Sequence, residues 1–331
     1  MVLSKEQVFA ATRGAVRTEL SDDGFHFFKC TERQYELWNN ESPVLGYRAL
    51  TTTGIRLDFV TDSDTVKIVV DKSYNDSITP PSSAKHEYEL LVDGLLTGAA
   101  LSEFENDRAT LSAPLPAGSH RVTFVLPSHR IGVIREVSLS DGATFAPYHG
   151  ERRRILFLGD SITQGWNSVK NVSSYAYRTA ALLDADPLIF GIGGSYFLPS
   201  SVERMGEKFD AVFVAYGTND FGRYASMRDF RDTVSRYFDN LCAAYPDTKR
   251  IAITPIYRTD DEKDREMGSF AELRRTVAEV AQAHGALVVD GYTLVPHDPY
   301  FYEDAHLHPN DLGFSFYAER LYAAVKGLFE A

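Results

Sequence analysis

Cysteine is scarce in this sequence, which has only Cys30 and Cys242 among its 331 residues. The two lie far apart, and neither belongs to a C-x-x-C pair or to a zinc-binding spacing. This pattern favours two free, buried thiols in a reducing compartment over a disulfide between domains. It also argues against a structural zinc site.

Long apolar runs and an excess of positive charge are absent as well. No stretch approaches the roughly 18 apolar residues that a membrane span needs, and Lys5, Glu6 and Arg13 interrupt any leader-like core at the start. The formal net charge is −12, and no basic stripe offsets it. We therefore expect a cytoplasmic protein that contacts neither membranes nor nucleic acid.

The first half of the chain alternates apolar and polar residues with a period of two, as strands do. Turn residues separate these runs, for example at positions 62–64, 80–83 and 93–94. Ser4 and Gln7 form a capping-box pattern that predicts a short helix at the start. The predicted strands lie near residues 55–59, 66–70, 88–92 and 122–126. We predict a β-sandwich or jelly-roll domain over residues 1–147.

From residue 148 onward the pattern changes to short apolar runs that alternate with helical periods. The run RILFL is followed by a helical stretch, and further apolar runs lie at PLIFG, AVFVA, RIAIT and ALVVD. Such alternation predicts an α/β domain with a parallel sheet over residues 148–331. Ligands in these domains bind beyond the carboxyl ends of the strands.

The first of these ends carries the sequence Gly159-Asp160-Ser161-Ile162-Thr163. A serine at a strand-to-helix turn can expose its hydroxyl above the sheet and act as a nucleophile, and the start of the helix offers N–H groups to a developing negative charge. The alternative is that Ser161 only caps the helix. The pentapeptide by itself leaves both interpretations open.

Two further strand ends carry residues that could bind an oxyanion. The stretch 191–195 reads GIGGS, and its glycines allow a substrate to approach the backbone N–H groups; a tight turn would also explain them. The stretch 217–220 reads GTND, where the Asn219 amide could donate to an oxyanion or form an Asx-turn. Asp220 is interpreted as structural, holding its loop through backbone hydrogen bonds.

The segment 303–311, EDAHLHPND, supplies histidines and carboxylates just before the last predicted helix. A nucleophilic serine needs a histidine base, and the base needs a carboxylate that fixes its tautomer. Either histidine could instead be a hydrogen-bonded surface or core residue. His306, His308 and Asp311 could also bind a metal, but no H-E-x-x-H motif or cysteine accompanies them.

The order of these four blocks resembles the SGNH (GDSL) hydrolase family over roughly residues 152–331. The resemblance implies a flavodoxin-like three-layer α/β/α domain and esterase activity without a metal or organic cofactor. It implies Ser161 as the nucleophile, with Asp304 and His308 as acid and base. The oxyanion hole would comprise the N–H groups of Ser161 and Gly194 and the side chain of Asn219.

One departure concerns the acid–base spacing, which is commonly D-x-x-H in the family. Asp304 and His308 are one residue further apart, whereas Glu303 and His306 have the usual spacing. We favour His308 because a proline follows it, as in similar family members. The altered spacing is also the one feature that favours a carbohydrate-binding protein that has lost activity.

The β domain ahead of the α/β domain resembles two-domain carbohydrate esterases, so we expect a small-molecule or saccharide ester as substrate, with acetyl groups on a saccharide first. An acyltransferase of the same fold is the alternative, and the oligomeric state stays open. Five aromatic residues near the motifs could stack on a sugar or belong to the core: Trp166, Tyr196, Phe197, Phe221 and Tyr224.

Overall fold

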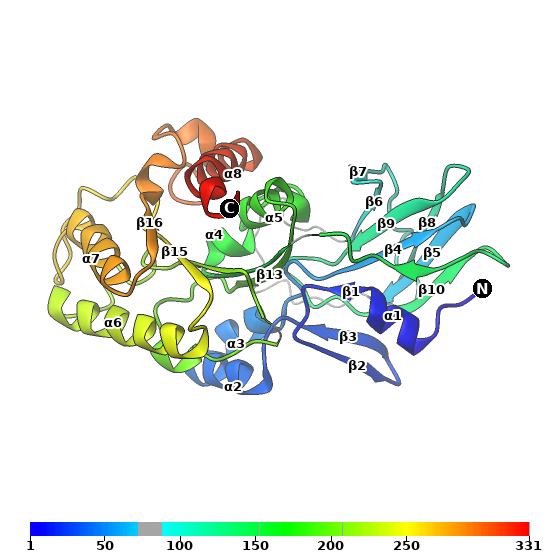
Figure 1. Cartoon of the computed structure of the whole chain (residues 1–331), viewed down its shortest axis with the longest axis horizontal. Coiled ribbons are helices and arrows are strands. Elements are labelled where there is room, and N and C mark those ends of the chain that lie inside the picture. The colour runs from blue at the N-terminus through cyan, green and yellow to red at the C-terminus, as the bar shows by residue number, and fades with distance from the viewer. Residues whose placement is uncertain (72–87, 152, 207, 331) are drawn as a thin grey trace.

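The computed structural model describes residues 1–71, 88–151, 153–206 and 208–330, so the turn predicted at 80–83 lies outside the described residues. Two antiparallel sheets form the first part of the chain, at the right of Figure 1, and one parallel sheet with its helices forms the second. This arrangement confirms the predicted β domain and the α/β domain. None of the helices in the described ranges combines the length and the apolarity that crossing a membrane requires.

The two antiparallel sheets enclose one apolar core. The first sheet has the order β2 (Arg17–Ser21), β3 (Gly24–Phe28), β10 (Ile134–Leu139), β5 (Thr65–Asp71) and β8 (Arg108–Pro114). The second has the order β1 (Thr12–Arg13), β4 (Arg56–Thr61), β9 (His120–Val125), β6 (Glu89–Val92) and β7 (Leu95–Leu96), with β11 (Ala146–Pro147) beside β4. The predicted short helix is α1 (Lys5–Ala11), which begins with the Ser4–Gln7 capping box.

The parallel sheet has the order β13 (Ala185–Gly191), β12 (Arg153–Gly159), β14 (Ala211–Ala215), β15 (Lys249–Ile253) and β16 (Leu287–Val289). In sequence order this is the 2-1-3-4-5 arrangement of flavodoxin-like folds. Successive side chains of β12 point to opposite faces: Leu156 and Leu158 belong to one core, and Ile155 and Phe157 to the other. The sheet is thus the middle layer of three.

Helices cover both faces of this sheet (Figure 1). One face packs against α6 (Met227–Ala244) and α7 (Phe270–Ala283), whose buried residues share the core of Leu156. The other face packs against α5 (Tyr175–Leu182) and α8 (Asp311–Val325). Because β12 lies between β13 and β14, the loops that follow these three strands emerge side by side at one edge.

Two helices that we did not predict lie within the first part of the chain. They are α2 (Glu32–Glu41) and α3 (Pro43–Leu50). Through Trp38 and Leu45 they pack into the core that contains Leu156, on one face of the parallel sheet. The period-two pattern of the surrounding strands obscured them, although Thr31 and Gln34 form a capping box. The domain boundary after residue 147 stays a prediction.

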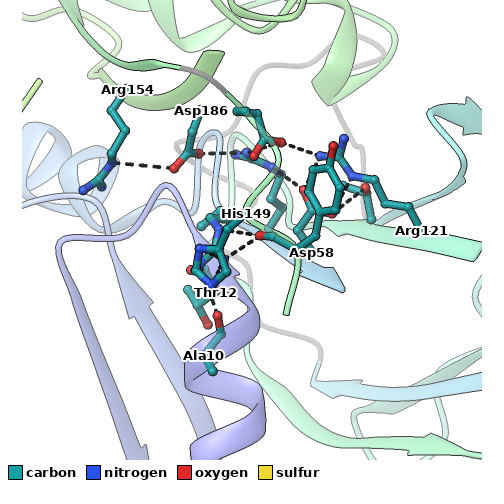
Figure 2. Close-up of polar contacts among 12 residues, drawn as sticks. Ala10, Thr12, Asp58, Arg121, His149, Arg154 and Asp186 are labelled. Atoms are coloured by element: carbon teal, nitrogen blue, oxygen red, sulfur yellow. Dashed lines mark hydrogen bonds and ion pairs between the residues drawn. The ribbon is translucent and has the colours of Figure 1, made fainter. Parts of the chain in front are cut away.

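Charged side chains also join the two parts (Figure 2). The buried Arg56 of β4 pairs with Asp186 of β13 at 2.8 Å. Asp186 also lies 3.7 Å from Arg154. Beside them, Arg121 of β9 pairs with Asp58 at 2.5 Å. Buried charges are tolerated only when they are paired, so this cluster fixes how the β part sits on the first strands of the α/β part.

Candidate active site

Ser161 lies at the turn between β12 and α4 (Ser161–Gln164). The residue that caps α4 is Asp160, whose carboxylate accepts the Ile162 N–H at 2.9 Å, so the serine is not the cap. The turn needs Gly159, because a Cβ atom there would collide with the Thr163 side chain and approach the Ala215 carbonyl to 2.9 Å. Ser161 is only 6% exposed, whereas we expected an exposed hydroxyl. The hydroxyl hydrogen-bonds to an imidazole.

That imidazole is His308. Its Nε2 atom lies 2.9 Å from the Ser161 Oγ atom, and its Nδ1 atom lies 2.6 Å from Asp304 Oδ2. The second carboxylate oxygen, Asp304 Oδ1, accepts the backbone N–H groups of His306, Leu307 and His308 at 3.0, 2.8 and 3.0 Å. The structure therefore brings Ser161, His308 and Asp304 into one chain of hydrogen bonds.

The local environment keeps Asp304 ionised. Partial burial of the carboxyl group favours its neutral form, but the hydrogen bonds from the His308 ring and from the Leu307 N–H outweigh burial and hold the pKa of Asp304 far below its ordinary value. An ionised carboxylate at Nδ1 keeps that nitrogen protonated and leaves Nε2 free to accept a proton from the serine.

The longer spacing between acid and base is absorbed by the backbone. Ala305 adopts a φ of 51°, and the chain from Asp304 to His308 wraps around the Asp304 carboxylate. His306 points elsewhere: its Nδ1 atom lies 2.5 Å from Thr259 Oγ1, and its Nε2 atom lies 3.7 Å from Asp260. The alternative base is thus held away from Ser161, and the spacing does not prevent His308 from reaching Asp304.

Two backbone N–H groups are free at the site. Within the described residues, the N–H of Ser161 has no partner because it opens α4, and the N–H of Gly194 has none either. Gly194 has a φ of 85°, which glycine adopts without strain. Asn219 donates one amide N–H to the Ser195 carbonyl at 2.9 Å, which leaves its second N–H for another acceptor. These are the three donors expected from the sequence.

The neighbouring N–H groups of the same loop are occupied. The Ile192 N–H bonds to the Gly159 carbonyl at 3.0 Å, and the Gly193 N–H bonds to Gln164 Oε1 at 2.8 Å. The Ser195 hydroxyl donates to the Gly159 carbonyl at 3.2 Å. These bonds hold the loop after β13 against the turn that carries Ser161, and they leave Gly194 as the available donor.

Three residues of the site region escaped the sequence analysis. Gln164 follows the serine block by one position; Lys29 and Arg48 come from the first part of the chain and donate to the carbonyls of Gly191 and Gly193, each at 2.9 Å. Trp166, by contrast, was among the five aromatic residues expected either to stack on a sugar or to belong to the core. The helix-start signals at Thr31 and at Ser42-Pro43 could have located the helices around Arg48, but not its contact 145 positions away.

The aromatic residues near the motifs divide into two groups. Tyr196, Phe197 and Phe221 are core residues with at most 9% exposure, and Tyr224 packs against the same core. Trp166 instead lies at the site, with its ring 6.1 Å from that of His308. Of the five aromatic residues, only Trp166 is therefore placed where it could contact a substrate.

Two buried carboxyl groups support the loops. Burial raises the pKa of Asp160, the cap of α4, to about 6. Burial likewise raises the pKa of Asp220 to about 7. The Asp220 carboxylate accepts the Phe197 N–H at 3.3 Å and the Tyr224 hydroxyl at 3.3 Å, so it links its loop to the loop after β13, and its structural role stays a prediction.

The three residues that could have bound a metal contact different partners. His308 contacts Ser161 and Asp304, His306 contacts Thr259, and Asp311 accepts the Val169 N–H at 2.7 Å. Across the described ranges, no group of three or more His, Cys, Asp and Glu side chains is arranged to hold a metal ion. The geometry at Ser161 instead has the parts that acyl transfer requires: a nucleophile, a base with its carboxylate, and N–H donors.

Comparison with known proteins agrees with this geometry. Residues 157–315 match the model of the GDSL-like Lipase/Acylhydrolase family. A salicylyl-acyltransferase from a tetracycline biosynthetic pathway has a similar structure, with a TM-score of 0.80 and 21% identity over 96% of this chain and 94% of that one. A search of curated protein sequences finds no match.

Two carbohydrate esterases of family two are also similar in structure. The one from Cellvibrio japonicus has a TM-score of 0.69 and 17% identity over 100% of this chain and 97% of that one. The one from Clostridium thermocellum, in complex with cellohexaose, has a TM-score of 0.67 and 18% identity over 96% and 98%. At these identities the likeness concerns the fold, and it extends over both parts of the chain.

Proposed function

We propose, from the premise that residues 157–315 form a domain of the GDSL-like lipase/acylhydrolase family, that this protein is a serine esterase with Ser161 as its nucleophile. The observation that carries the proposal is the chain of hydrogen bonds from Ser161 through His308 to Asp304. A serine hydroxyl is a weak nucleophile unless a base accepts its proton, and a neutral imidazole at 2.9 Å is within reach to do so.

Acylation follows from this arrangement. As the Ser161 Oγ atom attacks the ester carbonyl carbon, its proton moves to His308 Nε2, and the imidazolium that forms is stabilised by the ionised Asp304. The tetrahedral intermediate then collapses: the bond from carbon to the alkoxy oxygen breaks, and His308 returns the proton to the leaving alcohol. The acyl group stays on Ser161.

Deacylation repeats these steps with water. His308 takes a proton from a water molecule, the oxygen attacks the acyl carbon, and collapse releases the carboxylic acid while Ser161 regains its proton. In both steps, negative charge builds on the carbonyl oxygen. The N–H groups of Ser161 and Gly194 and the second amide N–H of Asn219 are the donors that would bind it.

Esters of saccharides, acetyl esters above all, are the substrate class that we propose. Trp166 supports this choice, because its half-buried ring beside His308 offers a face on which a sugar ring can stack. The carbohydrate esterases named above have the same two-part fold. Since the fold also occurs in an acyltransferase, transfer to an alcohol is the second candidate, and it differs only in the acceptor of the second step.

The test is labelling with a fluorophosphonate, followed by peptide mapping and an assay with short-chain aryl esters. We expect labelling at Ser161 and turnover of the esters, with both lost in Ser161→Ala. Ser168→Ala is the matched control, because the hydroxyl of this buried serine bonds, within the described residues, only to the Gly165 carbonyl, and its loss should leave both unchanged. Full activity in Ser161→Ala would refute the proposal. Addition of acceptor alcohols distinguishes hydrolysis from transfer, through the formation of new esters.

A further inference from the structure

The first part of the chain sends two basic side chains to the loop after β13, which we call the glycine loop (residues 191–195). Lys29 is fully buried and donates to the Gly191 carbonyl at 2.9 Å; its other two partners are the hydroxyls of Thr51 and Thr53. Arg48 donates from Nη1 to the Gly193 carbonyl at 2.9 Å. Both side chains therefore donate to carbonyl groups of the loop that contains Gly194, and burial lowers the pKa of Lys29 to about 7.

The contact of Arg48 matters because of peptide geometry. The carbonyl of Gly193 and the N–H of Gly194 belong to the same planar peptide group, and in a trans peptide they point in opposite directions. A donor that holds the carbonyl on one side therefore directs the N–H to the other side. The two flanking N–H groups already bond to Gln164 and Ile192, so this peptide group is the part of the loop whose orientation the other bonds leave free.

Arg48 is itself held in place. Its guanidinium lies over the Trp166 ring, with Cζ 4.6 Å from the ring centroid, and its Nε atom is buried without a hydrogen-bond partner among the described residues. Burial lowers the pKa of Arg48, and no carboxylate contributes to this shift. The positive charge is thus not neutralised by an acid, and its hydrogen bond to the Gly193 carbonyl is charge-assisted.

We propose that Arg48 is a positioning residue, which fixes and polarises the Gly193–Gly194 peptide group so that the Gly194 N–H is aimed at the developing oxyanion. This inference rests on the proposed function of Ser161. A cation at the carbonyl end draws electron density away from the nitrogen and makes the N–H a stronger donor. The first part of the chain would then complete the catalytic site of the second part.

The same geometry predicts a kinetic signature. Both acylation and deacylation pass through an oxyanion, so loss of Arg48 slows whichever step limits turnover. Loss of one oxyanion donor typically costs ~10²–10³ in rate, and misorientation of a donor that is still present should cost less. Because the effect lies in the transition state, kcat should fall while KM changes little.

The experiment compares Arg48→Ala and Arg48→Lys with Arg33→Ala in the full chain. Arg33 is a matched control on α2, since it pairs with Glu203 at 2.6 Å and is more than half exposed. For Arg48→Ala we expect a drop in kcat of roughly 10–100-fold with KM within threefold, and for Arg48→Lys a smaller drop. Millimolar ethylguanidinium should raise the kcat of Arg48→Ala at least fivefold, whereas ethylammonium should not. Arg33→Ala should match the wild type.

Unchanged kcat in Arg48→Ala would overturn the inference, and so would a change confined to KM, which would make Arg48 a substrate-binding residue. If Arg48→Ala fails to fold, Arg48→Lys decides: a lower kcat with KM within threefold in a folded Arg48→Lys variant supports the inference, and full activity or a loss confined to KM overturns it. Labelling of Ser161 in the wild type separates the two proposals. If the wild type shows neither labelling nor turnover, the proposed function is wrong. If it shows both and Arg48→Ala is as active as the wild type, only the proposed role of Arg48 is wrong.

Discussion

The Nε2 atom of His308 lies 2.9 Å from the Oγ atom of Ser161, although 147 positions separate the two residues in the sequence. The contact exists because Ser161 follows β12 and His308 precedes α8, which packs on one face of the same sheet. On the other side of the imidazole, Asp304 completes the chain of hydrogen bonds from hydroxyl to carboxylate.

Replacement of His308 tests this contact directly. We expect His308→Ala to lower kcat/KM on an aryl ester by at least ~10³-fold, because the serine loses its base. His306→Ala should stay within a few-fold of the wild type, since His306 contacts Thr259 and Asp260 instead. Steady-state kinetics of the two variants measure this difference. A larger loss in His306→Ala than in His308→Ala would reassign the base.

Asp304→Asn should lower kcat by roughly 10³–10⁴-fold, since an amide no longer fixes the tautomer of His308. The variant should also be less stable at neutral pH. The folded protein holds the pKa of Asp304 below its ordinary value of 3.8, so this carboxylate stabilises the fold above about pH 4, and the contribution disappears as the pH falls further. Urea unfolding should show a difference in the free energy of unfolding between wild type and variant that is smaller at pH 3 than at pH 7. A difference in the free energy of unfolding that does not depend on pH would contradict this account.

Asn219→Ala removes the side-chain donor of the oxyanion hole. We expect kcat to fall by ~10²–10³-fold, with a small loss of stability because the Ser195 carbonyl also loses its partner. Asn240→Ala serves as the comparison, because Asn240 donates to the Pro199 carbonyl on an exposed part of the surface. Equal kcat values for the two variants would show that Asn219 does not act in the oxyanion hole.

Asp220→Asn should change how stability depends on pH. Burial raises the pKa of Asp220 to about 7, so the folded state takes up a proton more readily than the unfolded state between pH 4 and pH 7. The wild type should therefore lose stability relative to Asp220→Asn as the pH rises from 5 to 8, by roughly 2–4 kcal/mol. Urea unfolding of both proteins at the two pH values measures the difference. A difference that grows in the opposite direction would show that the carboxylate is stabilised in its charged form.

Local patterns carried much of what could be predicted from the sequence. The alternation of period two located β4, β5, β6 and β9, and the short apolar runs located β12, β13, β14, β15 and β16. The helices α2 and α3 were missed because their apolar residues serve a core of the second part, while their neighbours in the sequence belong to β strands. The exposure of Ser161 was also misjudged: the residue is buried, and its hydroxyl bonds to a residue 147 positions away.

The sequence by itself determined which residue types stand at the ends of β12, β13 and β14, because strand periods and glycine turns depend on neighbouring residues. Only the tertiary structure decided which histidine meets Ser161 and which N–H of the glycine loop stays free. The choice of His308 depends on the backbone at Ala305 and on the contact of His306 with Thr259. The approach of Arg48 to Gly193 depends on how α3 packs against the sheet. Such contacts arise from the packing of distant segments, which no local spacing encodes.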